Sequence, residues 1–143
     1  MNKKLILLIE DDSDHEKITL SALKEGNMFS QTMVVRDGEE ALEYIFRKGR
    51  FSDRPIENPQ VILLDLKLPK VDGLEVLKQV RANPSTKNIP VVVLTSSELE
   101  KDFFSSYNYG ANSFIVKPLD LEKFNKIILH FIAYWFGINK NIS

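Results

Sequence analysis

The chain lacks cysteine altogether, has only two histidines, and shows almost no excess of either charge over its 143 residues. Without cysteine it can form no disulfide, perform no thiol catalysis and build no Cys-ligated zinc or iron–sulfur site. Two isolated histidines also leave little for a His-ligated metal, so we expect any metal to be held by oxygen. Lysine and arginine number 19 against 20 acidic residues, which is not the basic excess of a non-specific nucleic-acid binder.

Long hydrophobic runs are also missing. The apolar run 5–9 ends at Glu10 and is too short for a signal peptide. The longest nearly uncharged stretch, 127–138, falls well short of the about 20 residues that a membrane-spanning helix needs. We therefore expect a cytoplasmic protein without a membrane anchor, and the length predicts a single domain over residues 1–143 with no room for an effector domain.

Short apolar segments alternate with segments of helical periodicity, and they lie at 5–9, 33–35, 61–64, 91–94 and 114–116. Short, continuous runs rich in branched side chains are typical of strands buried on both faces of a parallel sheet. The alternation predicts a doubly wound α/β fold, a five-stranded parallel sheet with helices on both faces. The segment 47–60, with two prolines and a glycine, interrupts it and is interpreted as a solvated loop, or alternatively as a loop that contacts a partner.

Acidic side chains follow the first and third apolar runs. They are Glu10, Asp11 and Asp12 after the first run and Asp65 after the third. Ligands of open α/β sheets bind outside the carboxyl ends of the strands, so these acids are expected to approach one another. Carboxylates at such short distances repel each other, and a hard cation that binds oxygen ligands relieves the repulsion. Mg²⁺ is therefore the natural candidate. The alternative is helix capping, which we favour for Asp12 or Ser13 but which leaves Asp65 unexplained.

A hydroxyl and a lysine follow the fourth and fifth runs. Thr95 would donate a hydrogen bond to an anion that arrives with the metal, and Lys117 would supply a positive charge. The alternative for Lys117 is a solvated lysine in a turn. A nucleophilic Asp65 beside a magnesium ion, a hydroxyl and an ammonium group forms a site that can receive a phosphoryl group.

These strand-end residues resemble the motifs of the receiver domain of bacterial two-component response regulators, and the resemblance runs from about Lys4 to Phe136. The matching motifs are Glu10-Asp11, Asp65 followed by Leu-Lys-Leu-Pro, Asp72-Gly73, Thr95-Ser96 and Lys117-Pro118. The resemblance implies a flavodoxin-like receiver fold. It also implies a single-domain response regulator that takes a phosphoryl group from a histidine kinase onto Asp65 and relays the signal by protein contact.

The same resemblance implies a role for each site residue. The Mg²⁺ ligands would be Asp11, Asp65, the main-chain carbonyl of Lys67 and, directly or through water, Glu10. The phosphoryl oxygens would be bound by Thr95 and Lys117, and Thr95 with Phe114 would form the switch that responds to phosphorylation. For Phe114, packing within its strand is the alternative.

The last apolar stretch predicts a helix with two apolar stripes, of which one sheet face can bury only one. The second stripe consists of Leu129, Ile132 and Phe136. We interpret it as a self-association surface and predict a homodimer through this helix, with a helix covered by its own tail as the alternative. This end also resembles stand-alone receivers that partner bacterial phytochrome histidine kinases.

The competing hypothesis is an enzyme, a magnesium-dependent phosphatase of the haloacid dehalogenase type with Asp65 as nucleophile. That class places a second aspartate two residues after the nucleophile, where this chain has Lys67. We therefore favour a signalling phosphoacceptor limited to self-catalysed phosphoryl transfer and slow autodephosphorylation. His15 could touch the site, but for both His15 and His130 a surface position on a helix is favoured.

Overall fold

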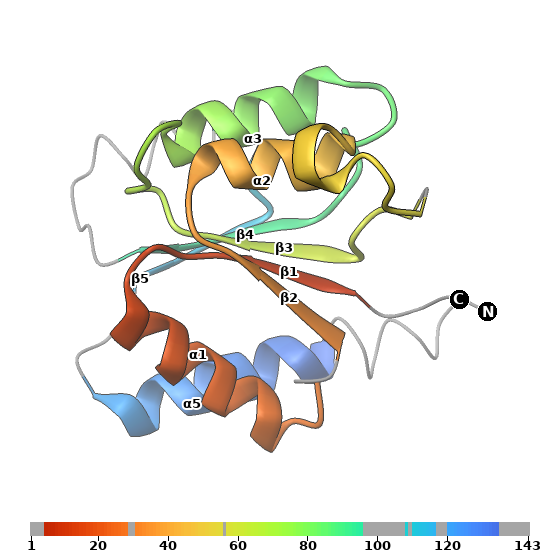
Figure 1. Ribbon diagram of the computed structural model, residues 1–143. Helices are drawn as coiled ribbons and strands as arrows, with labels where there is room; N and C mark the ends of the chain where they lie inside the picture. Colours follow the sequence, from red (N-terminus) through yellow and green to blue (C-terminus); the bar gives the residue numbers. More distant parts are fainter. Residues whose placement is uncertain are drawn as a thin grey trace.

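The sheet has five parallel strands in the order β2-β1-β3-β4-β5 (Figure 1). The strands are β1 (Ile6–Ile9), β2 (Thr32–Val35), β3 (Val61–Leu64), β4 (Val91–Thr95) and β5 (Ser113–Val116). The computed structural model from which they are taken describes residues 5–28, 31–55, 57–95, 108, 110–116 and 120–134. The five-stranded, doubly wound α/β fold predicted from the sequence is confirmed.

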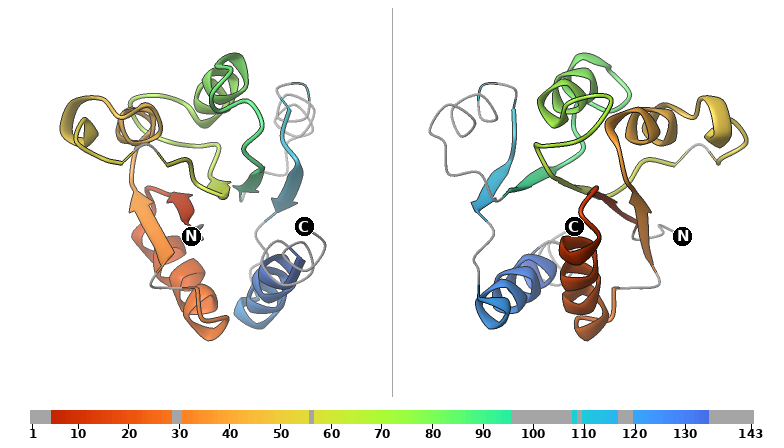
Figure 2. Two further views of the ribbon diagram at one scale, coloured as in Figure 1. Left: turned by 90° about the vertical axis from the view of Figure 1, so that its right-hand side faces the viewer. Right: turned by 60° about the vertical axis from the view of Figure 1, so that its left-hand side comes forward.

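Helices cover both faces of the sheet. They are α1 (Ser13–Glu25), α2 (Gly38–Phe46), α3 (Gly73–Ala82) and α5 (Leu121–Ile132), with a short 3₁₀ helix, η2 (Gly49–Phe51). The helices α2 and α3 lie on one face, and α1 and α5 lie side by side on the other (Figure 2). This arrangement leaves the carboxyl edge of the sheet between the two helical layers.

The hydrophobic core splits into two clusters because successive residues of a strand point to opposite faces. In β1, Leu7 and Ile9 belong to the cluster under α2 and α3, whereas Ile6 and Leu8 belong to the cluster under α1 and α5. Every residue of β1 and β3 is buried, which explains why both runs are continuously apolar.

An aspartate caps the start of each of the α-helices that the structure describes: Asp12 for α1, Asp37 for α2, Asp72 for α3 and Asp120 for α5. A carboxylate at this position accepts hydrogen bonds from backbone N–H groups of the first turn, which have no partner within the helix. The Oδ1 atom of Asp12 accepts from the N–H of Asp14 at 2.9 Å and of His15 at 3.1 Å. The predicted capping role of Asp12 is therefore confirmed.

The segment 47–60 is anchored on α2 by side chains. The guanidinium of Arg54 lies over the ring of Tyr44, 4.1 Å from its centroid, and donates to the main-chain oxygens of Tyr44 at 3.0 Å and Glu57 at 2.8 Å. Phe51 meets the same ring edge to face, with 5.1 Å between centroids. The interpretation of this segment as a solvated loop is thus only partly right, because part of the segment packs against the domain.

The helix α5 buries one apolar stripe, with Phe124, Ile128 and Phe131 in the core. Leu129, from the predicted second stripe, is half-buried. The side chain of Ile132 and all of Phe136 lie outside the described residues, so their interface role stays a prediction. Among the helices that the structure describes, none is long and apolar enough to cross a membrane.

Candidate metal and phosphoryl site

Two buried carboxylates meet where β1 and β3 end. The strands are paired in register with Ile9 opposite Leu64, so the next residues, Glu10 and Asp65, leave the sheet at the same level. The N–H of Asp65 donates to the carbonyl of Ile9 at 3.0 Å, and the N–H of Glu10 donates to the carbonyl of Val35 at 3.0 Å. Glu10 is 1% exposed and Asp65 8% exposed. The sequence predicted this convergence from the strand ends.

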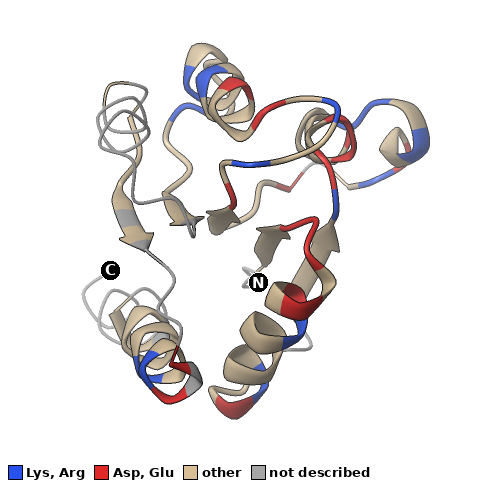
Figure 3. Cartoon of the chain, turned by 90° about the vertical axis from the view of Figure 1, so that its left-hand side faces the viewer, with Lys and Arg blue, Asp and Glu red and all other residues tan. Residues whose placement is uncertain are grey.

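A histidine joins the two carboxylates. One donor atom each of Glu10, His15 and Asp65 lies within 4.8 Å of the other two. Figure 3 shows the acidic segments that follow β1 and β3 at this edge, with the first turn of α1 beside them. His15 is half-buried and lies near both carboxylates, which agrees with the alternative that it touches the site.

The remaining acids of the first run lie outside this group of three side chains. Asp11 is exposed, and its carboxylate is not part of the group formed by Glu10, His15 and Asp65. The main-chain N–H of Asp12 lies 3.4 Å from Oε2 of Glu10, while its side chain caps α1. Metal binding by Asp11 therefore stays a prediction.

The loop between β3 and α3 holds one oxygen of Asp65. The N–H of Lys67 donates to Oδ1 of Asp65 at 2.9 Å, which places the main chain of Lys67 directly beside the carboxylate. That position is compatible with the predicted use of the Lys67 carbonyl as a metal ligand, which stays a prediction.

Two glycines let this loop pack tightly. The N–H of Gly38, at the start of α2, donates to the carbonyl of Pro69 at 3.2 Å, and the N–H of Gly73 donates to the carbonyl of Leu66 at 3.0 Å. A Cβ at position 38 would lie 1.8 Å from the carbonyl oxygen of Val71, and one at position 73 only 2.4 Å from that of Asp65. Only glycine fits at either place, so the glycines fix the path of the chain that carries Asp65.

The switch half of the predicted site is described only by its backbone. Thr95 is the last residue of β4 and is in register with Val116, the last residue of β5. Phe114 pairs with Val93 within the sheet. The side chains of Thr95 and Phe114, and the whole of Lys117, lie outside the described residues, and their roles stay predictions.

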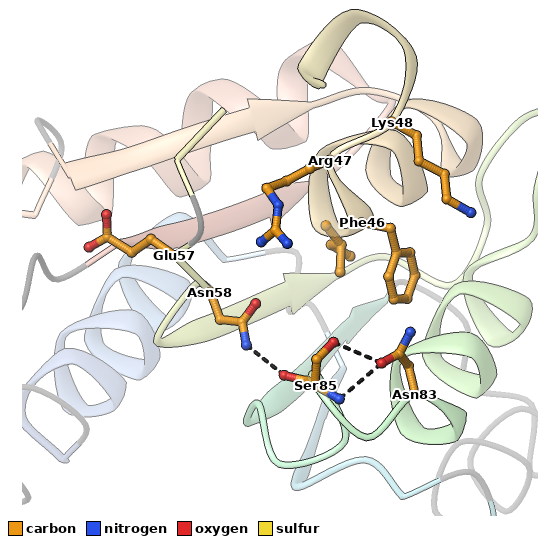
Figure 4. Close-up of a pocket in the computed structure, with 8 residues that line it drawn as sticks. Phe46, Arg47, Lys48, Glu57, Asn58, Asn83 and Ser85 are labelled. Atoms are coloured by element: carbon orange, nitrogen blue, oxygen red, sulfur yellow. Dashed lines mark hydrogen bonds between the residues drawn. The ribbon is translucent and has the colours of Figure 1, made fainter. Parts of the chain in front are cut away.

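A separate cavity of about 340 Å³ lies at the opposite edge of the sheet (Figure 4). It is lined by Ile45, Phe46, Arg47, Lys48, Glu57, Asn58, Asn83 and Ser85. Asn58 donates to the carbonyl of Ser85 at 2.7 Å, and Ser85 donates through its hydroxyl to Oδ1 of Asn83 at 2.7 Å. The cavity faces the amino ends of β3 and β4 and is no part of the acidic site.

Sequence reasoning considered contact of His15 with the site but favoured a surface position, although a signal for the contact was present. It is the third residue of α1, and side chains in a helix tilt toward its amino end. Because α1 starts directly after the carboxyl end of β1, this tilt directs a residue of the first turn toward the strand ends. The informative feature was therefore the position of His15 in the first turn of α1, rather than the polarity of the residues around it.

Buried carboxylates at the ends of β1 and β3 of a doubly wound sheet are suited to a cation at the carboxyl edge of the sheet. The chain belongs to the response regulator receiver domain family, whose model matches residues 6–129. The family and the flavodoxin-like receiver fold implied by the sequence motifs are thus confirmed, and receiver domains are phosphoryl-accepting signalling modules.

The chain is similar to several response regulators, two of which are described as phytochrome or bacteriophytochrome response regulators. Response regulator Rcp1 of Synechocystis sp. is 36% identical over 132 residues, covering 92% of this chain and 88% of Rcp1. The structure of the phosphorylated cyanobacterial phytochrome response regulator RcpA superposes with a TM-score of 0.87 at 36% identity, over 94% of this chain and 95% of RcpA. The bacteriophytochrome response regulator RtBRR is 49% identical with a TM-score of 0.77, over 90% and 78% of the two chains. Rcp1 has also been solved in a Mn²⁺-bound form, with a TM-score of 0.85 at 36% identity, over 92% of this chain and 94% of Rcp1.

Proposed function

We propose that Asp65 accepts a phosphoryl group from a histidine kinase in a Mg²⁺-dependent reaction, and that the protein relays this signal by protein contact. The observation that carries the proposal is the meeting of buried Glu10 and Asp65 at the carboxyl edge of a receiver fold. An oxygen of Asp65 attacks phosphorus, an O–P bond forms as the P–N bond of the donor phosphohistidine breaks, and the imidazole nitrogen released takes up a proton.

A divalent cation is the cofactor of the site. Glu10 and Asp65 supply the carboxylate oxygens that hard cations prefer, and the related Rcp1 binds Mn²⁺. We propose Mg²⁺ as the ion, with Asp11 and the Lys67 carbonyl as further ligands. When bound, the cation neutralises charge that builds on the transferring group, which is the main requirement of phosphoryl transfer.

The protein's own groups position the reactants. The N–H of Lys67 holds Oδ1 of Asp65, and the packing of Gly73 against the Asp65 carbonyl fixes the backbone beneath it. Thr95 and Lys117 are proposed to bind the phosphoryl oxygens. The phosphatase alternative finds no support, because Lys67 stands where that class needs a general acid and its N–H is bound to the nucleophile.

The experiment is phosphorylation by acetyl phosphate, followed by intact mass. Wild-type protein with Mg²⁺ is expected to gain about 80 Da, the mass of one phosphoryl group on a carboxylate nucleophile. Asp65→Asn and chelation of the metal should both abolish the gain, whereas Asp53→Asn, an exposed aspartate in the loop after η2, should not. An Asp65→Asn protein that still gains the full mass contradicts the proposal.

The partner we propose is a histidine kinase of the phytochrome type, encountered in the cytoplasm. The support is the similarity to RcpA and RtBRR, which are named as phytochrome and bacteriophytochrome response regulators and which match 94% and 90% of this chain. The test is phosphoryl transfer from candidate phytochrome kinases, where preference for a kinase of another type would oppose the assignment.

We also propose a homodimer through α5. Leu129 of α5 is half-buried and Tyr134, two residues beyond the end of the helix, is 53% exposed, so apolar surface remains once the core is complete. Sedimentation of the wild type at micromolar concentration should give a dimer, and Leu129→Glu should give a monomer. Lys126→Glu, on an exposed position of the same helix, is the control and should stay dimeric. A monomeric wild type, phosphorylated or not, contradicts the dimer.

A further inference from the structure

The group of Glu10, His15 and Asp65 mixes two kinds of donor, two carboxylates and one imidazole. The composition of the chain had led us to expect oxygen ligands alone. A ring nitrogen at a cation site changes which ions the site prefers, because imidazole suits later first-row transition metals while carboxylates and water suit Mg²⁺.

The position of His15 is fixed by the start of α1. Its N–H donates to Oδ1 of Asp12 at 3.1 Å, which holds the residue in the first helical turn. The side chain of such a residue is directed toward the amino end of the helix, and this end adjoins the carboxyl end of β1. The backbone therefore keeps the imidazole at the rim of the site.

The distances suit a common ion. Two ligand atoms that each lie about 2.1 Å from one ion are separated by roughly 3 to 4 Å. The three donor atoms lie within 4.8 Å of one another, which is close to this separation. In the part of the chain that the structure describes, this is the one group of three such side chains that gathers so closely.

The burial of the three side chains is graded. Glu10 and Asp65 are buried at the base, and His15 is half-buried, closer to solvent. An ion held between them would keep water on its exposed side, which leaves room for a phosphoryl oxygen.

We propose that His15 is a nitrogen ligand of the divalent cation at Glu10 and Asp65, so that this site selects later transition-metal ions over Mg²⁺ more strongly than its carboxylates alone would. The proposal rests on the proposed metal site at Asp65 and adds a ligand to it. A site of this kind can be loaded by more than one ion, and the ion present would then tune phosphoryl uptake.

The test measures binding of Ni²⁺ and of Mg²⁺ by calorimetry, with protein that carries no histidine tag. His15→Ala is expected to weaken Ni²⁺ binding about tenfold or more, as loss of a metal-site contact does, and to change Mg²⁺ binding less than about threefold. His130→Ala removes the chain's other histidine, which is exposed on α5, and should leave both affinities unchanged. Equal effects of His15→Ala on the two ions, or no effect on either, would overturn the proposal.

A spectroscopic measurement keeps the test independent of how the variant folds. Pulsed electron paramagnetic resonance of the wild type loaded with Mn²⁺ should show coupling to an imidazole nitrogen, which His15→Gln and His15→Ala remove. Absence of that coupling in the wild type refutes the proposal outright.

Acetyl phosphate labelling of the same samples with Mg²⁺ separates the two proposals. If the protein is labelled but its preference for Ni²⁺ over Mg²⁺ does not depend on His15, the ligand proposal is wrong and the proposed phosphorylation of Asp65 is still supported. Selectivity without labelling supports the ligand and ends the proposed function.

Discussion

Replacing Gly73 by alanine should disturb the phosphoryl site more than the fold. The new Cβ would lie 2.4 Å from the Asp65 carbonyl oxygen, whereas ordinary contacts of a Cβ begin at 3.4 Å, so the chain must separate there by about 1.0 Å. Overpacking of this kind costs about 1–3 kcal/mol, and the lower entropy of the unfolded alanine chain returns about 0.4–1 kcal/mol. We expect a net loss of about 1–2 kcal/mol, or roughly 3–7 °C in the melting temperature.

The effect on phosphoryl uptake should be larger. A misplacement of about 1 Å in a reacting group can lower a rate about 100-fold, and the atom displaced here belongs to the acceptor residue itself. The assay is phosphorylation by acetyl phosphate well below the melting temperature, where the variant is folded. Gly26→Ala is the control, because Gly26 ends α1 far from the site with φ −87°, which alanine adopts without strain. A Gly73→Ala protein that loses stability but labels at the wild-type rate would refute the link between this packing and the site.

Two further predictions concern the scaffold. Arg81 donates from Nε to the Gly110 carbonyl at 2.9 Å and from Nη2 to Oδ1 of Asn112 at 2.8 Å. Arg81→Met removes these hydrogen bonds and should lower the free energy of unfolding, measured by urea titration, by about 3 kcal/mol. A loss under about 0.5 kcal/mol would contradict this. Burial raises the pKa of Tyr44 above its usual 10.0, partly opposed by Arg54, so the folded state favours the neutral phenol. The resulting stability is present below pH 10.0 and is lost as the pH rises through the pKa of Tyr44 in the folded state. The Tyr44→Phe variant should therefore lose less stability between about pH 9 and 11 than the wild type does. Equal losses in the two proteins would oppose the assignment.

The sheet could be predicted because β1 and β3 are buried on both faces and their sequences are therefore continuously apolar. The edge strand β2 gave a weaker signal, since three of its four residues are only half-buried, and its start at Thr32 lies one residue before the apolar run. The anchoring of 47–60 was not predictable from periodicity. It depends on Arg54 stacking on Tyr44, a contact between side chains of two separate segments.

The site was predictable where the backbone alone sets the geometry. Register along β1 and β3 brings Glu10 and Asp65 together whatever the surrounding side chains do. Asp11 is exposed and outside this group, and its role as a metal ligand stays a prediction. The placement of His15 beside the two carboxylates depends on the tilt of side chains in the first turn of α1. The pattern of polar and apolar residues in the sequence does not reveal this tilt.

The most direct measurement of the central claim locates the phosphoryl group in the chain. Protein labelled with acetyl phosphate and Mg²⁺ is reduced with borohydride, which converts an aspartyl phosphate to homoserine, and the peptides are sequenced by mass spectrometry. Homoserine at position 65 alone is the expected result. Homoserine at Asp11 or Asp12 instead, or no conversion at Asp65, would contradict the account of the site.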